Sequence, residues 1–248
     1  SALARVQAAR RLGRDVVLVS MGTVITGDSK LGWEGRKVGI DGQPRGLTGR
    51  ELCRAAWAGA FDAFGARCAE DGPLIVVSLG PQQDPLGDLE APPNAICQAF
   101  VPQVDILKAG VRVFLTHGGQ NSLTEALATA TPVVVCPGFG DQVVNGSKAV
   151  ALGVGLKADR PDPDAGGEVE AAAVYRAGVC RKLCDVVDTA SCQEAAAACA
   201  ERLLKAGGVQ RAVELVLRAA AGDGPAEKQL SQPLPRVTAS ARAVRAGA

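Results

Sequence analysis

The sequence predicts an α/β fold in which a doubly wound parallel sheet is covered by helices on both faces. Short apolar runs recur up to about residue 158, and helical patterns lie between them. Several runs are apolar throughout instead of alternating with polar residues, as expected of strands buried on both faces. Alternation of such strands with helices through short links favours a Rossmann-like sheet.

The predicted strands and helices follow one another in a regular order. Two helices carry a start signal, since Thr48 precedes Glu51 by three residues and Ser122 precedes Glu125 by three, and this spacing predicts a capping box in each case. Shorter helices are expected at 105–109 and 142–152. The strands are predicted at VVLVS (16–20), LIVVSL (74–79), AICQAF (95–100), VRVFLT (111–116), PVVVC (132–136) and VGLKA (154–158).

Three segments depart from this alternation. After residue 168 the strands stop, and two Ala-rich helical stretches are expected at about 169–188 and 191–220. We therefore expect one domain over residues 1–222 and a flexible tail over 223–248. A long Gly-rich insert covers residues 27–49, and connections of that length are usually functional or disordered. Trp33 within it is either a local packing staple or part of the rim of a site.

Composition excludes several classes of function. The 248 residues carry 27 Lys and Arg against 26 Asp and Glu, so charge gives no reason to expect nucleic acid or an anionic membrane as partner. No apolar run reaches the roughly 18 to 20 residues of a transmembrane span. No signal-peptide pattern is present, and a cytoplasmic location is expected.

The cysteines and the single histidine do not predict a metal site. The chain has 8 cysteines, none in a C-x-x-C motif, and one histidine cannot complete a Cys/His zinc set. Cys180 and Cys184 lie four residues apart on a predicted helix and share a face. A disulfide or a metal pair there stays open, but small apolar residues of a reduced protein are favoured.

The turn HGGQN (117–121) follows a strand, and ligands of open α/β sheets bind beyond the carboxyl ends of strands. Its Gly pair allows the backbone to approach a ligand closely. The helix that follows offers unpaired N–H groups and the positive end of a dipole, which suit a phosphate. The first strand ends in a similar way, so Ser20, Gly22 and Thr23 are expected to line the same pocket.

Each polar side chain near these strand ends has two interpretations. His117 is either tied to nearby backbone or donates to a phosphate oxygen. Glu125 either closes a capping box or accepts the two hydroxyls of a ribose. Asp141 is either the N-cap of the next helix or, with Gln142, binds the hydroxyls of a sugar. Spacing alone leaves these alternatives open.

Taken together, these motifs resemble a known family. The stretch from FVPQ (100–103) through THGGQNSLTEAL (116–127) to GDQVVN (140–145) is similar to the donor-binding signature of UDP-glycosyltransferases of the GT-B fold, in particular the macrolide and plant small-molecule enzymes. VVLVSMGTV (16–24) resembles the first strand and turn of their C-terminal domain, and GGVQRAVELV (207–216) resembles its late helix. The resemblance covers residues 15–220 approximately and implies the C-terminal half of a GT-B fold.

The resemblance implies how a UDP-sugar would be held at its nucleoside end. Phe100 stands where the family has an aromatic residue that stacks on the uracil ring. Val101 and Gln103 fall in the stretch that lines the base. Glu125 would bind the ribose, and this implication favours the second interpretation of that side chain.

The diphosphate and the sugar are assigned in the same way. His117, Gly119, Asn121 and Ser122, helped by Thr23, would hold the diphosphate. Gln120 stands after the Gly pair, in place of the Trp or Met that the family usually has there, and this departure concerns the contact on the sugar side. The remaining sugar-binding residues implied by the resemblance are Asp141 and Gln142, of which the second is typical of glucosyl donors in plant relatives.

The implied activity is metal-independent transfer of a hexose, by preference glucose, from a UDP-sugar to an acceptor hydroxyl with inversion. No cofactor is expected beyond the UDP-sugar donor, and the acceptor would be a small molecule or a lipid. Family members carry an N-terminal domain that binds the acceptor and supplies a catalytic histidine. We therefore expect no catalytic residue in this chain, and an acceptor domain and general base in an N-terminal domain or a partner chain.

Two other functions compete with this one. The chain could be a non-catalytic nucleotide-sugar-binding or structural subunit of a larger assembly. A weaker alternative is another GT-B protein such as a UDP-sugar epimerase.

Overall fold

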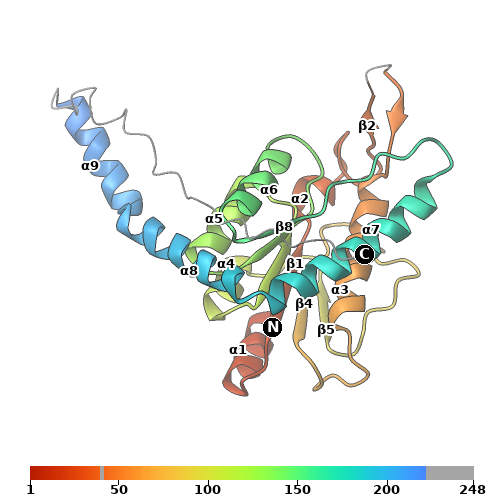
Figure 1. The fold of residues 1–248 in the computed structure, drawn as a ribbon, viewed down its shortest axis with the longest axis horizontal. Helices are drawn as coiled ribbons and strands as arrows, with labels where there is room; N and C mark the ends of the chain where they lie inside the picture. Colours follow the sequence, from red (N-terminus) through yellow and green to blue (C-terminus); the bar gives the residue numbers. More distant parts are fainter. Residues whose placement is uncertain (40–41, 222–248) are drawn as a thin grey trace, which may run out of the picture. The chain divides into compact units, whose positions relative to one another are not determined.

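The computed structural model describes residues 1–39 and 42–221 and contains a parallel sheet with the strand order β5-β4-β1-β6-β7-β8 (Figure 1). Every neighbouring pair in this sheet is parallel. All six strands predicted from the apolar runs are present, and the predicted fold class is confirmed. Their bounds are β1 Val16–Ser20, β4 Leu74–Ser78, β5 Ala95–Gln98, β6 Val113–Thr116, β7 Val133–Val135 and β8 Gly155–Lys157.

The strand order has a switch point beside β1. The chain runs from β1 to β4 and β5 on one side of the sheet, then returns to place β6, β7 and β8 on the other side. Ser20 at the end of β1 is paired in register with Thr116 at the end of β6. Connections therefore leave β1 and β6 in opposite directions, which opens a crevice at their carboxyl ends.

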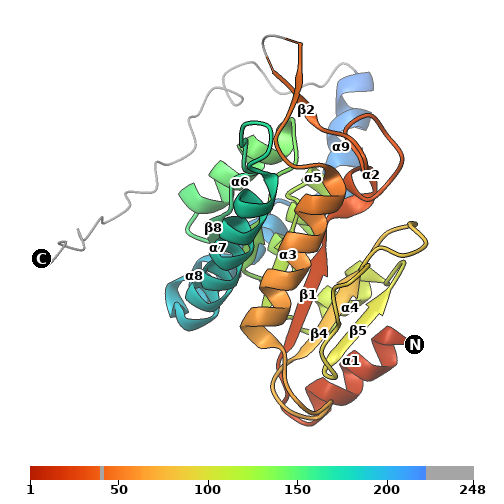
Figure 2. The ribbon, with the colours of Figure 1, turned by 90° about the vertical axis from the view of Figure 1, so that its right-hand side faces the viewer.

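Helices cover both faces of the sheet (Figure 2). α3 and α7 lie on one face, and α1, α4, α5 and α6 lie on the other together with part of α8. The bounds are α1 Ala2–Arg11, α2 Gly22–Ile25, α3 Gly49–Phe64, α4 Gln103–Ala109, α5 Gln120–Ala128, α6 Asp141–Ala151, α7 Glu168–Asp188, α8 Ala190–Lys205 and α9 Gly208–Ala220.

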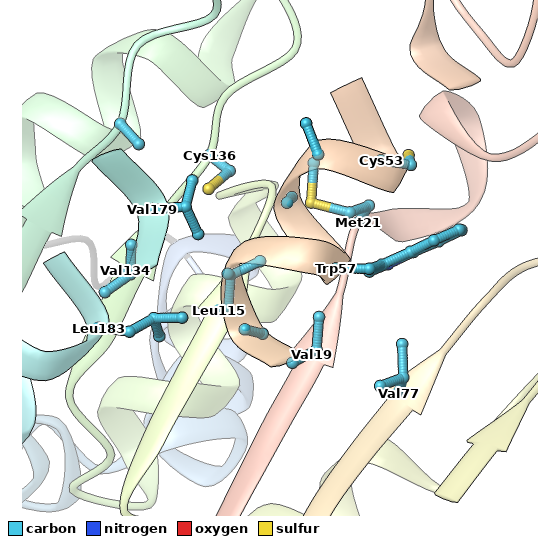
Figure 3. Close-up of a cluster of buried hydrophobic side chains, with 14 of the residues drawn as sticks. Val19, Met21, Cys53, Trp57, Val77, Leu115, Val134, Cys136, Val179 and Leu183 are labelled. Atoms are coloured by element: carbon cyan, nitrogen blue, oxygen red, sulfur yellow. The ribbon is translucent and has the colours of Figure 1, made fainter. Parts of the chain in front are cut away.

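The two faces of β1 explain why its sequence is apolar throughout. Val17 and Val19 point into the core beneath α3 and α7, whereas Val16 and Leu18 point into the opposite core. All four side chains are buried because helices cover both sides. Figure 3 shows the first of these cores, in which Val19 lies among side chains of the sheet and of the helices above it, including Leu115, Val134, Trp57, Val179 and Leu183.

One of the two predicted capping boxes is confirmed. The Thr48 hydroxyl accepts a hydrogen bond from the Glu51 amide at 3.1 Å, and the Glu51 carboxylate accepts from the Thr48 amide at 2.7 Å. The predicted box at Ser122 and Glu125 is wrong. α5 begins at Gln120 with Gly119 as its N-cap, so Ser122 lies inside the first turn, where it cannot cap.

The start of α6 and the end of α8 also differ from the prediction. Asp141 is the first residue of α6 and not its N-cap, because Gly140 takes the positive φ of 58° at the cap position. The helix expected over 191–220 is two helices. Gly207 and Gly208 between them have φ values of +81° and +53°, which interrupt a right-handed helix.

α1 was not predicted. Its buried residues are Ala2, Val6 and Ala9, a helical spacing of four and three. Two of these three buried residues are alanines, which are only weakly hydrophobic. The apolar face of this Arg-rich helix therefore does not stand out in the sequence.

The chain divides into a compact unit over Ser1–Leu203 and a second unit that begins at Leu204. The sheet and the pocket described below lie in the first unit. The predicted tail (223–248) lies outside the described residues, and the predicted domain boundary at residue 222 stays a prediction. Within the part that is described, no helix is both long and apolar enough to cross a bilayer.

The insert over residues 27–49 folds back on the domain and ends in a small antiparallel hairpin of β2 (Lys37–Val38) and β3 (Pro44–Arg45). Trp33 packs on Trp57 with ring centroids 6.1 Å apart, and the Arg54 guanidinium lies 6.0 Å from the Trp33 ring. Trp33 is only 7% exposed. It is therefore a packing staple that fastens the insert to α3.

Replacing this staple tests its contribution to stability. Trp33→Ala is expected to lower the free energy of unfolding by about 3 kcal/mol, because it removes a buried aromatic ring and its tilted contact with Trp57. Val38→Ala, at an exposed strand position of the same insert, is the control and should change it by less than about 0.5 kcal/mol. Equal effects of the two variants in urea denaturation would show that the staple does not hold the insert.

Candidate functional site

A pocket of about 550 Å³ lies at the switch point, beyond the ends of β1, β4 and β6. Its walls come from α2, the start of α4 and the start of α5. The structure brings together here ten of the residues that the sequence assigns to a donor site: Thr23, Phe100, Val101, Gln103, His117, Gly119, Gln120, Asn121, Ser122 and Glu125. Asp141 and Gln142, which were assigned to the sugar, are not part of the lining.

His117 occupies the floor of this pocket between two glycines. A Cβ added to Gly22 would lie 2.5 Å from the imidazole Cε1, and one added to Gly119 would overlap Nε2. Gly22 also has a φ of +74°, which side chains other than glycine rarely adopt. The His117 amide donates to the Ser20 carbonyl at 3.3 Å, which joins the ends of β6 and β1. The imidazole is therefore fixed by packing.

One ring nitrogen of His117 is buried without a good partner. Its Nδ1 forms no hydrogen bond with acceptable geometry to any described residue. Burial lowers the pKa of His117, and the nearby Ser20 carbonyl and then the charge of Asp141 oppose this effect more weakly. A buried ring nitrogen without a partner is costly, so the packing around the ring, and not a hydrogen bond to Nδ1, holds the imidazole in place.

The start of α5 adds donors to the same wall. The helix has 9 residues, and no side chain caps its first turn because the N-cap is Gly119. The amides of Gln120 and Asn121 are consequently left without helical acceptors, at the positive end of the dipole. With the Thr23 hydroxyl opposite, these groups form a cradle suited to an anion such as a diphosphate.

Glu125 is oriented by a neighbouring side chain. Gln103 Nε2 donates to Glu125 Oε2 at 2.7 Å and to Ser122 Oγ at 3.1 Å. The carboxylate is thus free of the capping role that the sequence had left open. An ionised carboxylate can accept about four hydrogen bonds, so Glu125 retains capacity for the hydroxyls of a ribose.

The edge of the pocket carries an exposed aromatic ring. Phe100 is 62% exposed, in the loop between β5 and α4. An exposed large apolar side chain beside polar groups is typical of a binding surface. Its place in the lining, next to Val101 and Gln103, is suited to stacking on a flat ring.

Asp141 and Gln142 lie beside the pocket. Gln142 is only 4% exposed, and its Oε1 accepts from the amides of Gly138 at 2.8 Å and Phe139 at 3.3 Å. Asp141 is exposed at the start of α6. Asn145 donates to Asp141 Oδ2 at 3.2 Å and to the Gly118 carbonyl at 2.9 Å. Gln142 therefore shapes its own loop, whereas Asp141 is held near the turn that carries His117.

Three polar residues of this region received no role from the sequence. Asn145 was noticed only as part of a motif, and its bonds depend on contact between α6 and the β6–α5 turn, which spacing does not show. Ser78 and Asp105 also line the pocket. The rule that ligands bind beyond strand ends would have indicated Ser78, the last residue of β4.

Metal ligands and reactive thiols do not contribute to this site. The described residues contain no group of three or more His, Cys, Asp or Glu side chains arranged to hold a metal ion. Cys180 and Cys184 on α7 are free, so the disulfide that the sequence left open is not formed.

The six parallel strands, the helices on both faces and the pocket at the switch point define a Rossmann-like α/β domain, a fold that solved GT-B glycosyltransferases share. The solved calicheamicin glycosyltransferase CalG4 matches with a TM-score of 0.58 and 22% identity over 86% of this chain and 43% of that one. Os79 from O. sativa in complex with UDP matches with a TM-score of 0.51 and 20% identity over 75% of this chain and 35% of that one. These similarities establish the fold.

Sequence comparison points to the same class. Residues 88–162 match the family described as UDP-glucoronosyl and UDP-glucosyl transferase. The uncharacterized UDP-glucosyltransferase YojK of Bacillus subtilis (strain 168) is 30% identical over 154 residues, which are 61% of this chain and 35% of that protein. The UDP-glycosyltransferase CGT of Oryza sativa subsp. indica is 43% identical over 65 residues, 26% of this chain and 14% of that protein. The resemblance to UDP-glycosyltransferases is thus confirmed, for a chain that spans about a third of the Bacillus relative.

The packing of the imidazole can be tested by a single methyl group. Gly119→Ala is compatible with the local φ of −58° but places its Cβ on Nε2 of His117. We expect the ring to be displaced and the affinity for UDP, measured by calorimetry, to fall about tenfold or more. Gly178→Ala is the control, because a Cβ there meets nothing within 4 Å. Unchanged UDP affinity in Gly119→Ala would contradict the role of this packing.

The burial of His117 predicts a contribution to pH-dependent stability. Its pKa is lowered in the folded chain, so below its ordinary value of about 6.5 the unfolded chain binds a proton that the folded chain does not. The free energy of unfolding should therefore fall as the pH drops through that region. Denaturation of wild type and His117→Gln at pH 7.5 and about 5.5 isolates this term. The loss on acidification should be smaller in the variant, and an equal loss would contradict the assignment.

Proposed function

We propose that this chain binds a UDP-sugar in the switch-point pocket and serves the transfer of its hexose, by preference glucose, to an acceptor hydroxyl with inversion. The observation that carries the proposal is the convergence, in one pocket, of the His117 imidazole, an uncapped helix N-terminus and an oriented carboxylate. The imidazole and the helix N-terminus suit a diphosphate, and the carboxylate suits the hydroxyls of a ribose. The similarity to UDP-glycosyltransferases supports the same assignment.

In this proposal the uracil stacks on the exposed ring of Phe100, and the ribose hydroxyls donate to Glu125 held by Gln103. The diphosphate lies between Thr23 and the first amides of α5, with His117 beneath it. The hexose then extends toward Gln120 and Asp141. Gln142 contributes through the loop that it shapes, because its side-chain oxygen already accepts two amides.

The transfer itself is a displacement at the anomeric carbon. The acceptor oxygen forms a bond to that carbon while the bond to the phosphate oxygen breaks and its electron pair leaves with UDP. Negative charge grows on the diphosphate, where His117 and the α5 amides stabilise it. A general base takes the proton of the acceptor hydroxyl. No metal or other cofactor forms part of the proposal.

We assign the base and the acceptor site to a separate domain or partner chain. His117 is the only histidine of the 248 residues, its ring is packed between Gly22 and Gly119, and we assign it to the diphosphate. The acceptor would be a small molecule or a lipid that reaches the open side of the pocket. A cytoplasmic location, as expected from the sequence, is part of the same proposal.

Calorimetry with UDP and UDP-glucose tests the proposal. Wild type should bind both, and His117→Ala and Glu125→Ala should each bind UDP about ten- to a hundredfold more weakly, since each loses hydrogen bonds to a ligand that carries charge or paired hydroxyls. The exposed Glu90→Ala, outside the pocket, should bind like wild type.

Absence of UDP binding by the wild-type chain would overturn the proposal. Binding of both ligands, with no transfer or hydrolysis even after an acceptor domain from a similar enzyme is added, would favour a non-catalytic binding subunit. Transfer that appears only after that domain is added would support the proposal that this chain binds the donor while another domain supplies the base and the acceptor site.

A further inference from the structure

Arg160 is a buried cation in the segment that follows β8. It is 7% exposed, its Nε has no hydrogen-bond partner, and none of the ion pairs among the described residues includes it. Its guanidinium instead donates to three main-chain carbonyls, those of Gly138 at 3.1 Å, Leu47, and Gly35 at 3.5 Å. A buried charge is costly unless it is hydrogen-bonded, so these contacts decide where the side chain lies.

The three carbonyls belong to two segments that are far apart in the sequence. Gly35 and Leu47 lie at the two sides of the hairpin in the insert over residues 27–49. Gly138 lies in the loop between β7 and α6, one turn before Asp141. A single guanidinium therefore fastens the insert to the loop that leads into α6.

Gly138 is held by a hydrogen bond to its carbonyl, a hydrogen bond from its amide and close packing against α2. Its carbonyl accepts from Arg160, and its amide donates to Gln142 Oε1 at 2.8 Å. A Cβ at Gly138 would lie 2.5 Å from Cδ1 of Ile25, the last residue of α2. The loop is thus fixed between α2, α6 and Arg160, and it has little freedom to move while these contacts persist.

We propose that Arg160 is a positioning residue through which the insert fixes the 137–140 loop, and thereby Asp141, for the hexose of the donor. This inference rests on the proposed function. Removal of the guanidinium leaves the Gly138 carbonyl without its donor, so the loop gains freedom to shift, whereas Arg160 makes no hydrogen bond to β1, α4 or the start of α5. The nucleotide end of the pocket should consequently be preserved, whereas the sugar end should lose its fit.

Comparing the affinity for UDP with the affinity for UDP-glucose distinguishes a change at the sugar end of the pocket from a general loss of stability, which would weaken both. Wild type, Arg160→Met and Arg160→Lys are titrated with UDP and with UDP-glucose below their unfolding temperatures, which are measured for each variant. Arg160→Lys keeps the charge and can reach one carbonyl, so its effect should be smaller. Arg176→Met removes an exposed guanidinium paired with Asp62 and is the matched control.

For Arg160→Met the affinity for UDP is expected to stay within about twofold of wild type, while the ratio of the dissociation constants for UDP-glucose and UDP rises about tenfold. Arg176→Met should change neither quantity. An unchanged ratio in Arg160→Met, or an equal loss of affinity for both ligands, would overturn the inference.

Hydrogen exchange of the ligand-free chain keeps the inference testable if UDP does not bind at all. In Arg160→Met and Arg160→Lys, peptides that cover 133–142 and 33–47 should exchange faster, whereas peptides of α4 and α5 should not. Unchanged exchange in either of the first two regions would show that Arg160 does not couple them. Failure of wild type to bind UDP would instead refute the proposed function, whatever the exchange shows.

Discussion

The packing of one imidazole between two glycines is the constraint on which the pocket depends. His117 follows β6 and Gly22 follows β1, so they meet only because these strands are adjacent, parallel and in register at their ends. A side chain at Gly22 or Gly119 would occupy the space of the ring. The topology of the sheet and the two glycines therefore leave space for a histidine at the base of the pocket, where burial lowers its pKa.

The same requirement shapes the neighbouring helix. Gly119 must be small to accommodate the imidazole, and it is also the N-cap of α5, where it provides no capping side chain. The first amides of α5 are left open for that reason. Because the helix begins before Ser122, Glu125 is released from capping and is oriented by Gln103 instead. The free amides of α5 and the free carboxylate of Glu125 thus both follow from the need for a small residue at position 119.

The sequence predicted the parts that depend on neighbours along the chain. Apolar runs located the six strands, and the strand-end rule placed His117, Thr23 and Gly119 in one pocket, although Gly118 is not part of its lining. It could not show contacts that join distant segments, such as the stacking of Trp33 on Trp57 or the bonds from Arg160 to Leu47 and Gly138.

The sequence also could not decide between two structural roles when the same residue pattern fits both. Thr48 and Ser122 have the same spacing to a glutamate, yet only Thr48 lies outside its helix and caps it. The difference arises from tertiary packing around Gly119. Likewise, the side chain of Gln142 suited a sugar by composition, but the amides of its own loop are closer partners.

The most direct test is a crystal structure of the chain with UDP. We predict that the diphosphate lies within hydrogen-bond distance of His117 and of the first amides of α5, that the ribose lies on Glu125, and that the uracil lies against Phe100. UDP bound elsewhere, for example in the groove between α3 and α7 lined by Ala55 and Ala172, would contradict it. A diphosphate in the pocket that makes no contact with the imidazole would contradict the role given to His117.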